Sequence, residues 1–206
     1  FAAAVAFSKT EVLQTAIFEA LILGVVVTVQ TGIAIAVGVF ATVMLAFVKT
    51  NLSFANIQQS LLSRQMAIGL AAGAFLGFCT VAYGAAMQAM TGGSLLNNAI
   101  YAAAIGVTIQ AACFGAYLYV AKRNEFIASF VEWRRAGLAG VWASICSICW
   151  FAAFLSHEVA PVRAVGQVEL LFSVGFSILY FKERVTRLEL TAMALLALSI
   201  IMVLLD

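Results

Sequence analysis

Apolar runs about 20 residues long dominate the chain, and short stretches between them hold most of the charged and turn-forming residues. A helix rises about 1.5 Å per residue, so a run of about 20 residues crosses a hydrocarbon layer of roughly 30 Å. Transmembrane strands would need alternating polarity, whereas runs such as Ala192 to Leu205 are apolar on every face. The pattern predicts an all-α protein, a polytopic bundle of transmembrane helices. Seven spans are expected, at about 2–24, 29–48, 66–90, 98–120, 136–156, 161–181 and 187–205.

The composition strengthens the membrane assignment. Hydrophobic residues make up 65% of the chain and charged residues only 10%, whereas soluble domains carry roughly a quarter charged residues. The net charge is only +2, and the basic residues lie in the connections, which excludes nucleic acid as a partner. The expected partners are the lipid bilayer and a small-molecule solute, and the expected location is a bacterial inner (plasma) membrane.

Residues that could carry metal or covalent chemistry are few. Cys79, Cys113, Cys146 and Cys149 all lie in apolar runs, where free cysteines are expected to be small buried packing residues. The pair Cys146 and Cys149 has zinc-like spacing but no second ligand pair follows it, and His157 is the single histidine. No phosphate-binding glycine loop is present. The sequence therefore predicts no metal, no cofactor, no ATP-driven step and no enzyme activity.

Most basic residues fall in alternate connections. On one side of the predicted bundle only Arg163 is basic. The positive-inside rule then makes the other side cytoplasmic and the C-terminus external. The residues counted on the cytoplasmic side are Lys49, Arg64, Lys122, Arg123, Arg134, Arg135, Lys182, Arg184 and Arg187.

An internal repeat is visible when residues 164–171 are laid over residues 6–13. This alignment superposes Glu169 on Glu11 and pairs the helix-turn-helix layouts that follow them. Acids are rare inside lipid, so their superposition is the informative part of the match. The repeating unit is then five helices, with residues 1–50 as the last two helices of the first unit, 51–65 as a connecting loop and 66–206 as the complete second unit.

The first residues are apolar and lack an initiator methionine, so the chain is expected to be a fragment without the three opening helices. Restoring these helices gives ten spans in two five-helix halves. Because five is odd, the halves are inverted in the membrane, as in many secondary transporters. The seven-span chain alone is expected to transport nothing.

The end of each repeat carries a family resemblance. Residues 167–186 form an apolar helix followed by Lys182-Glu-Arg-Val-Thr, then a closing apolar helix, and residues 9–28 are the counterpart. The sequence resembles the drug/metabolite transporter superfamily of the EamA type. It departs from that pattern at Val25, where the first repeat lacks the acid that the second has in Glu183. The resemblance implies ten helices with both ends cytoplasmic, which differs from the charge count and leaves the orientation open. It also implies a secondary transporter that moves a small organic metabolite, such as an amino acid or a drug, by alternating access.

Polar residues inside the end helices are the candidate substrate or proton pathway. Glu11, Thr15 and Glu19 share one helix face, because they are spaced four residues apart. We expect Glu11 and Glu169 to face the bundle interior; the alternative is that they lie solvated near helix ends or cap a neighbouring helix. The second half offers the matching stripe Glu169, Ser173 and Ser177, with Lys9 and Gln167 near the mouth of the pathway.

Two further sets of residues are candidates for a cavity and for helix packing. Gly69, Gly73 and Gly77 recur at helical spacing and predict close packing against another helix, the alternative being a sliding or gating surface. The residues that could line a cavity for a partly aromatic or zwitterionic solute, or otherwise pack in the core or anchor at the membrane interface, are Tyr83, Gln88, Tyr101, Gln110, Trp142 and Trp150.

Two other classes compete with the transporter. A seven-helix receptor or light-driven protein fits the span count, but retinal binding needs a lysine in the last span, and residues 187–205 contain none. A membrane enzyme needs a catalytic cluster, which the sequence does not show.

Overall fold

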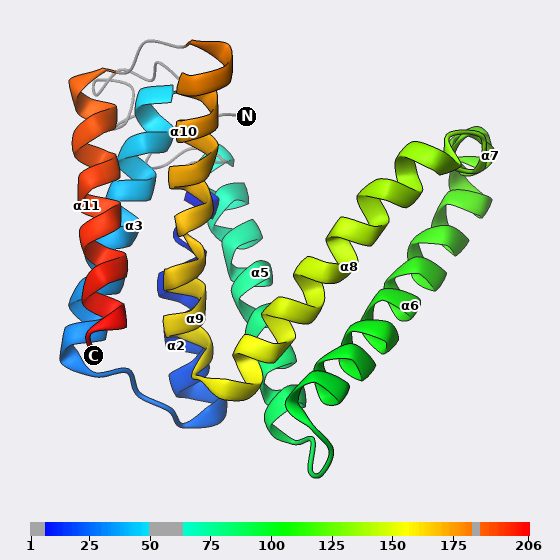
Figure 1. Cartoon of the computed structure of the whole chain (residues 1–206), viewed down its shortest axis with the longest axis horizontal. Coiled ribbons are helices and arrows are strands. Elements are labelled where there is room, and N and C mark those ends of the chain that lie inside the picture. The colour runs from blue at the N-terminus through cyan, green and yellow to red at the C-terminus, as the bar shows by residue number, and fades with distance from the viewer. Residues whose placement is uncertain (1–6, 50–63, 183–185) are drawn as a thin grey trace. The chain divides into compact units, whose positions relative to one another are not determined.

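A computed structural model describes residues 7–49, 64–182 and 186–206, and all regular structure within them is helical (Figure 1). This confirms the all-α prediction for the described chain. The helices are α2 (Glu11–Leu23), α3 (Val29–Lys49), α5 (Arg64–Gln88), α6 (Leu95–Ala121), α7 (Arg123–Val131), α8 (Trp133–Ser156), α9 (Val159–Gly166), α10 (Val168–Phe181) and α11 (Arg187–Leu204).

Among the described residues, 6 helical stretches are long and apolar enough to cross a membrane. The chain is therefore an integral membrane protein with transmembrane helices. These stretches match the predicted spans from the second to the last. They are Val29–Ala46, Met66–Gln88, Leu95–Ala121, Ala136–Ser156, Val159–Tyr180 and Arg187–Leu204.

The structure adds detail to the predicted spans. Residues 2–6 of the first predicted span lie outside the described residues, and the described part of that span contains α2, which has 13 residues. The span predicted at 161–181 is divided at Gln167 into α9 and α10. The predicted connection between α6 and α8 contains a further helix, α7, whose first turn is supported by the ion pair of Lys122 with Glu125 at 3.0 Å. The predicted loop at 51–65 lies outside the described residues except for its last two, which belong to α5.

Local sequence signals account for several helix ends. The Thr186 side chain accepts a hydrogen bond from the Glu189 backbone N–H, and the Glu189 carboxylate accepts from the Thr186 N–H at 2.7 Å, so a capping box starts α11. Ser94 caps α6 by accepting from the Asn97 N–H at 3.3 Å. Gly24 ends α2 in the left-handed region, where a glycine pays no steric penalty.

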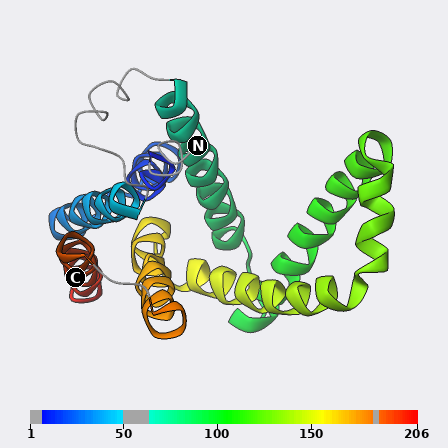
Figure 2. The ribbon, with the colours of Figure 1, turned by 90° about the horizontal axis from the view of Figure 1, so that it is seen from above.

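Residues 83–156 form one compact unit of the chain. Within it α6 and α8 pack against each other as a hairpin with α7 at the turn (Figure 2). Its small interior includes Met87, Ala99, Ala103, Phe151 and Phe154. The membrane stretches of α6 and α8 are each only 11% buried, so most of their apolar surface is available to lipid or to further helices.

The other compact unit comprises residues 1–82 and 157–206, and the antiparallel pair of α3 and α11 is its most extensive contact. Figures 1 and 2 both show these two helices side by side. Ser199 Oγ donates to the Ala34 carbonyl at 2.7 Å, while Gln30 Nε2 donates to the Met202 carbonyl at 3.0 Å. The first contact joins residues 34 and 199 and the second joins residues 30 and 202, so the two helices are antiparallel. A Cβ on Gly38 would lie 2.5 Å from Ser199 Oγ, so only glycine permits this close approach.

Hydrogen bonds also tie the end of α11 to the start of α3. The Asp206 carboxylate accepts from the Thr31 hydroxyl at 2.6 Å and also from the Thr28 hydroxyl. The hydrogen bonds from Thr28 and then Thr31 hold the pKa of Asp206 below its usual range. Thr28 also accepts from the Thr31 backbone N–H at 3.1 Å and so caps the first turn of α3.

Candidate functional site

Glu19 of α2 reaches the first turn of α9 and is fully buried there. Its two carboxylate oxygens accept from the backbone N–H groups of Val159 at 2.6 Å and Ala160 at 2.7 Å. The first N–H groups of a helix have no partner within the helix and carry a partial positive charge. The carboxylate satisfies two of them and fixes the start of α9 on the face of α2. Glu19 thus lies in the interior, as expected for its helix face. It caps a neighbouring helix there, which is the alternative that the sequence analysis gave for Glu11 and Glu169.

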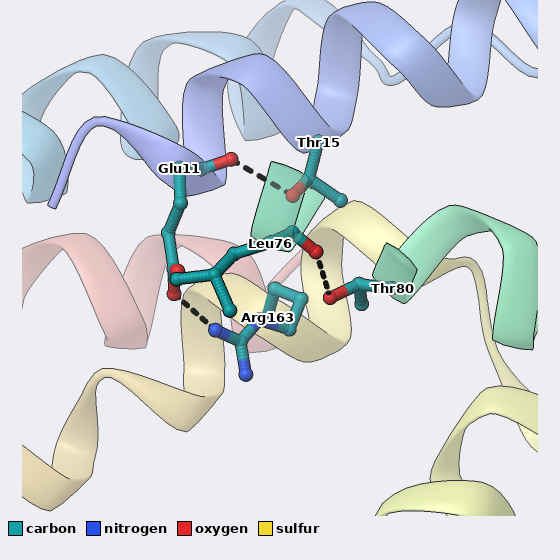
Figure 3. Close-up of polar contacts among 5 residues, drawn as sticks. All are labelled: Glu11, Thr15, Leu76, Thr80 and Arg163. Atoms are coloured by element: carbon teal, nitrogen blue, oxygen red, sulfur yellow. Dashed lines mark hydrogen bonds and ion pairs between the residues drawn. The ribbon is translucent and has the colours of Figure 1, made fainter. Parts of the chain in front are cut away.

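Glu11 lies two helical turns before Glu19 and forms an ion pair with Arg163 of α9 (Figure 3). The Arg163 side chain is 21% exposed and that of Glu11 is 9% exposed. Paired charges offset much of the cost of placing each of them in an apolar bundle. Thr15, between the two acids, is also buried and donates its hydroxyl to the Glu11 carbonyl at 2.8 Å. The whole predicted stripe of Glu11, Thr15 and Glu19 is therefore buried, and its two acids hold α2 to α9.

The glycines of α5 lie against the same stretch of α2. A Cβ on Gly77 would lie 3.0 Å from Thr15 Oγ1 and 3.3 Å from the Glu11 carbonyl oxygen. A Cβ on Gly73 would lie 3.1 Å from the Ser8 carbonyl oxygen, and Gly69 is buried one turn earlier. Next to them Thr80 donates to the Leu76 carbonyl within α5 at 2.8 Å (Figure 3). The absence of side chains on this stripe lets α5 approach the backbone of α2.

We expect Gly77→Leu to lower the free energy of unfolding by about 1–3 kcal/mol, because the new side chain has no space against α2. Gly140→Leu is the matched control, since no atom lies within 4 Å of the Cβ position at Gly140 in α8. Thermal unfolding in detergent compares the two variants, which share any gain in helix propensity. Equal melting temperatures would mean that Gly77 does not set the packing distance.

Gln167 is the single residue between α9 and α10, which together form one apolar span, and it is 5% exposed. Its backbone N–H bonds to the Ala164 carbonyl at 3.2 Å, and its side-chain Oε1 is buried without a hydrogen-bond partner. Next to it is a small internal cavity lined by Thr42 of α3 and Ser199 of α11 as well as Gln167. Gln167 thus places a buried polar side chain beside Thr42 of α3 and Ser199 of α11.

The second polar stripe does not face inward, which corrects the prediction for Glu169 and Ser173. Both are exposed, and Ser177 is half-buried. Gln167 and Glu169 are two residues apart, or roughly 200° around a helix, so an inward Gln167 turns Glu169 outward. Ser173 follows one turn after Glu169 and shares its exposed face. Lys9 is half-buried at the start of the first stripe.

A second candidate site lies wholly within residues 83–156. It is a groove of about 370 Å³ lined mainly by apolar residues, including Met87 and Ile105. Gln110 Nε2 donates to the Tyr83 hydroxyl at 3.0 Å, and Tyr101 lines the same groove. Tyr83 also meets Phe151 edge to face, with ring centroids 5.1 Å apart. The groove therefore combines one polar pair with a large apolar wall, which is the usual character of small-molecule sites.

Comparison with protein-family models, with curated proteins and with solved structures found no match. The family resemblance therefore rests on the residues of this chain alone.

Other predicted residues take positions outside these two sites. Gln88 and Trp142 are exposed and do not line the groove, while Trp150 is half-buried and packs near Phe154. The prediction that the four cysteines are buried is wrong: all four are free and exposed. Three of the four lie on α6 and α8, whose surfaces are largely unpacked. Across residues 7–49, 64–182 and 186–206 there is no group of three or more potential metal ligands.

Proposed function

We propose that the protein is a secondary transporter that moves a small organic solute across the membrane by alternating access. The interrupted span of α9 and α10 carries this proposal. Its break holds the buried Gln167, and its first half carries Arg163 paired with Glu11 of α2. Gln167 keeps right-handed helical backbone angles, so the span is interrupted at one residue without unwinding. Polar groups buried inside a membrane span usually face a partner or a pathway, and inverted-repeat transporters place their binding sites among such groups near the bilayer midplane.

The pairing of the helices supports two inverted halves. In the proposed repeat, α2 corresponds to α10, which continues the same membrane stretch as α9, and α3 corresponds to α11. The contacts of Glu19 with Val159 and of Glu11 with Arg163 make α2 and α9 antiparallel, and α3 and α11 are antiparallel as well. Equivalent helices of inverted halves cross the membrane in opposite directions. This arrangement fits a ten-span protein of the EamA type, with residues 66–206 as its second repeat.

The groove of residues 83–156 favours a solute with an apolar body and a hydrogen-bonding group. Tyr83 accepts from Gln110 and still has its own O–H to donate, whereas the remaining lining is mostly apolar. Amino acids and drug-like amines or amides with an aromatic or aliphatic part have this chemistry. We place the protein in a bacterial inner membrane as part of the same proposal.

The test is uptake of a panel of amino acids and amphipathic drugs by vesicles that contain the full-length protein. For the solute that is taken up, Tyr83→Phe and Gln110→Leu should each raise KM about tenfold, the effect of losing about one hydrogen bond. Tyr119→Phe is the matched control, because Tyr119 packs on Phe126 outside the groove. Absence of uptake across the panel would contradict the transporter, and unchanged KM values would contradict the groove as its solute site.

A further inference from the structure

The helix α7 lies at the end of the hairpin formed by α6 and α8. The membrane stretch of α6 ends at Ala121 and that of α8 begins at Ala136, so the residues between them lie at a membrane surface. Figure 1 shows α7 end-on, which means that it runs across the two spans rather than along them. Residues 119–135, which we call the α7 tip, therefore meet the headgroup region of the bilayer.

The apolar side of α7 is largely uncovered. Ile127, Phe130 and Val131 share one side of the helix by their spacing, whereas Glu125 and Ser129 lie on the opposite side. The three apolar side chains are 53%, 65% and 73% exposed, in the same order. A short amphipathic helix at a membrane surface buries such a side at the boundary between the headgroups and the acyl chains.

Two exposed arginines of the α7 tip rest on aromatic rings. The guanidinium carbon of Arg123 lies 5.6 Å from the ring centroid of Tyr119, and that of Arg134 lies 5.6 Å from the ring centroid of Trp133. Tyrosine and tryptophan favour the depth of the headgroups. A ring contact uses the flat face of a guanidinium and leaves the N–H donors at its edge for another partner. Among the residues that the structure describes, no carboxylate pairs with either arginine.

The charge of the α7 tip favours an anionic partner. Lys122 and Glu125 neutralise each other in their ion pair at 3.0 Å. The other charged residues of the tip are Arg123, Glu132, Arg134 and Arg135, which leaves an excess of positive charge. A second copy of the tip would bring like charges together, whereas an anionic membrane surface brings the opposite charge. The planar guanidinium also matches the geometry of a phosphate group.

We propose that the α7 tip is a binding site for anionic phospholipids such as phosphatidylglycerol. Arg123 and Arg134 donate hydrogen bonds to the phosphate groups, and the apolar side of α7 enters the boundary with the acyl chains. The site holds the end of the α6–α8 hairpin at one depth in the membrane. This binding does not depend on the transport of a solute.

The experiment measures which phospholipid contacts Trp133 when the whole chain is reconstituted in vesicles of phosphatidylglycerol and phosphatidylcholine. The substitutions Trp142→Phe and Trp150→Phe leave Trp133 as the single tryptophan. Quenching of its fluorescence by a brominated form of either lipid gives the ratio of the two association constants at the tip. The ratio should favour phosphatidylglycerol by at least about fivefold, the preference expected for one basic residue at an anionic surface. Arg123→Gln combined with Arg134→Gln should remove this preference.

Lys122→Gln combined with Glu125→Gln is the matched control, because it removes two exposed charges from the same tip without changing its net charge. This variant should keep the original ratio. If the tryptophan substitutions prevent folding, spin-labelled forms of the two lipids measure the ratio averaged over the surface of the wild-type chain, which only the arginine variant should lower.

Equal association of the two lipids at Trp133 would overturn the proposal, and so would a preference that the arginine variant retains. Trp133 fluorescence that neither brominated lipid quenches would show that protein covers the tip, from a second copy or from another helix. That result would overturn the proposal too.

Discussion

Glu19→Ala is expected to lower the free energy of unfolding by about 2–4 kcal/mol. The substitution leaves the backbone N–H groups of Val159 and Ala160 without their carboxylate acceptor in a fully buried position. It also removes the negative charge that interacts with the positive end of α9. Glu19→Gln keeps one acceptor oxygen and should lose about half as much. Denaturant titration in detergent micelles measures the effect.

Glu169→Gln is the matched control for this prediction. Glu169 is an acid in the first turn of α10, but its side chain is exposed, so its loss should change stability by less than about 0.5 kcal/mol. If Glu19→Ala and Glu169→Gln have equal effects, the attachment of α2 to α9 does not depend on the Glu19 carboxylate.

Arg163→Gln is expected to destabilise the chain by about 2–3 kcal/mol, because Glu11 then keeps a buried charge without the cation that pairs with it. The value is below that of a fully buried pair because the Arg163 side chain is 21% exposed and solvent screens the pair. The double variant Glu11→Gln with Arg163→Gln should recover most of the loss. A double-mutant cycle of unfolding free energies measures the coupling between the two residues.

The pair of Lys122 and Glu125 provides the comparison. These side chains are 50% and 61% exposed, so the corresponding cycle should give a coupling below about 1 kcal/mol. Strictly additive effects at Glu11 and Arg163 would show that their contact contributes nothing to the packing of α2 on α9.

The face formed by Glu11, Thr15 and Glu19 was predictable because it depends on helical spacing within one segment. Two acids eight residues apart in an apolar helix, with a threonine midway between them, share one face, and the cost of exposing the acids to lipid favours an inward direction for that face. The glycine stripe of α5 follows from the same periodicity. In both cases the sequence alone contains the geometry, and the structure adds the identity of the neighbour, α2 or α9.

The partners of these residues were not predictable from spacing. Arg163 was counted with the basic residues of the connections. Its partner Glu11 lies 152 positions away in the chain, and helical spacing cannot pair residues so far apart. The break at Gln167 had only the weak signal of Gly166 followed by a polar residue in an apolar run. The direction of Glu169 depends on which neighbour is buried: Gln167 is buried two residues earlier, which places Glu169 on the opposite, exposed face. The helix α7 was missed because its charged first turn is typical of a connection.

Counterflow of the solute taken up by the full-length protein is the most direct test of the central claim, secondary transport by alternating access. Vesicles preloaded with unlabelled solute are diluted into a trace of labelled solute, and accumulation of the label is followed over time without any ion gradient. A carrier that exchanges solute through one alternating site predicts a transient overshoot of label, which vesicles without protein do not show. Label that enters no faster than in protein-free vesicles, or that only equilibrates without an overshoot, would contradict the account.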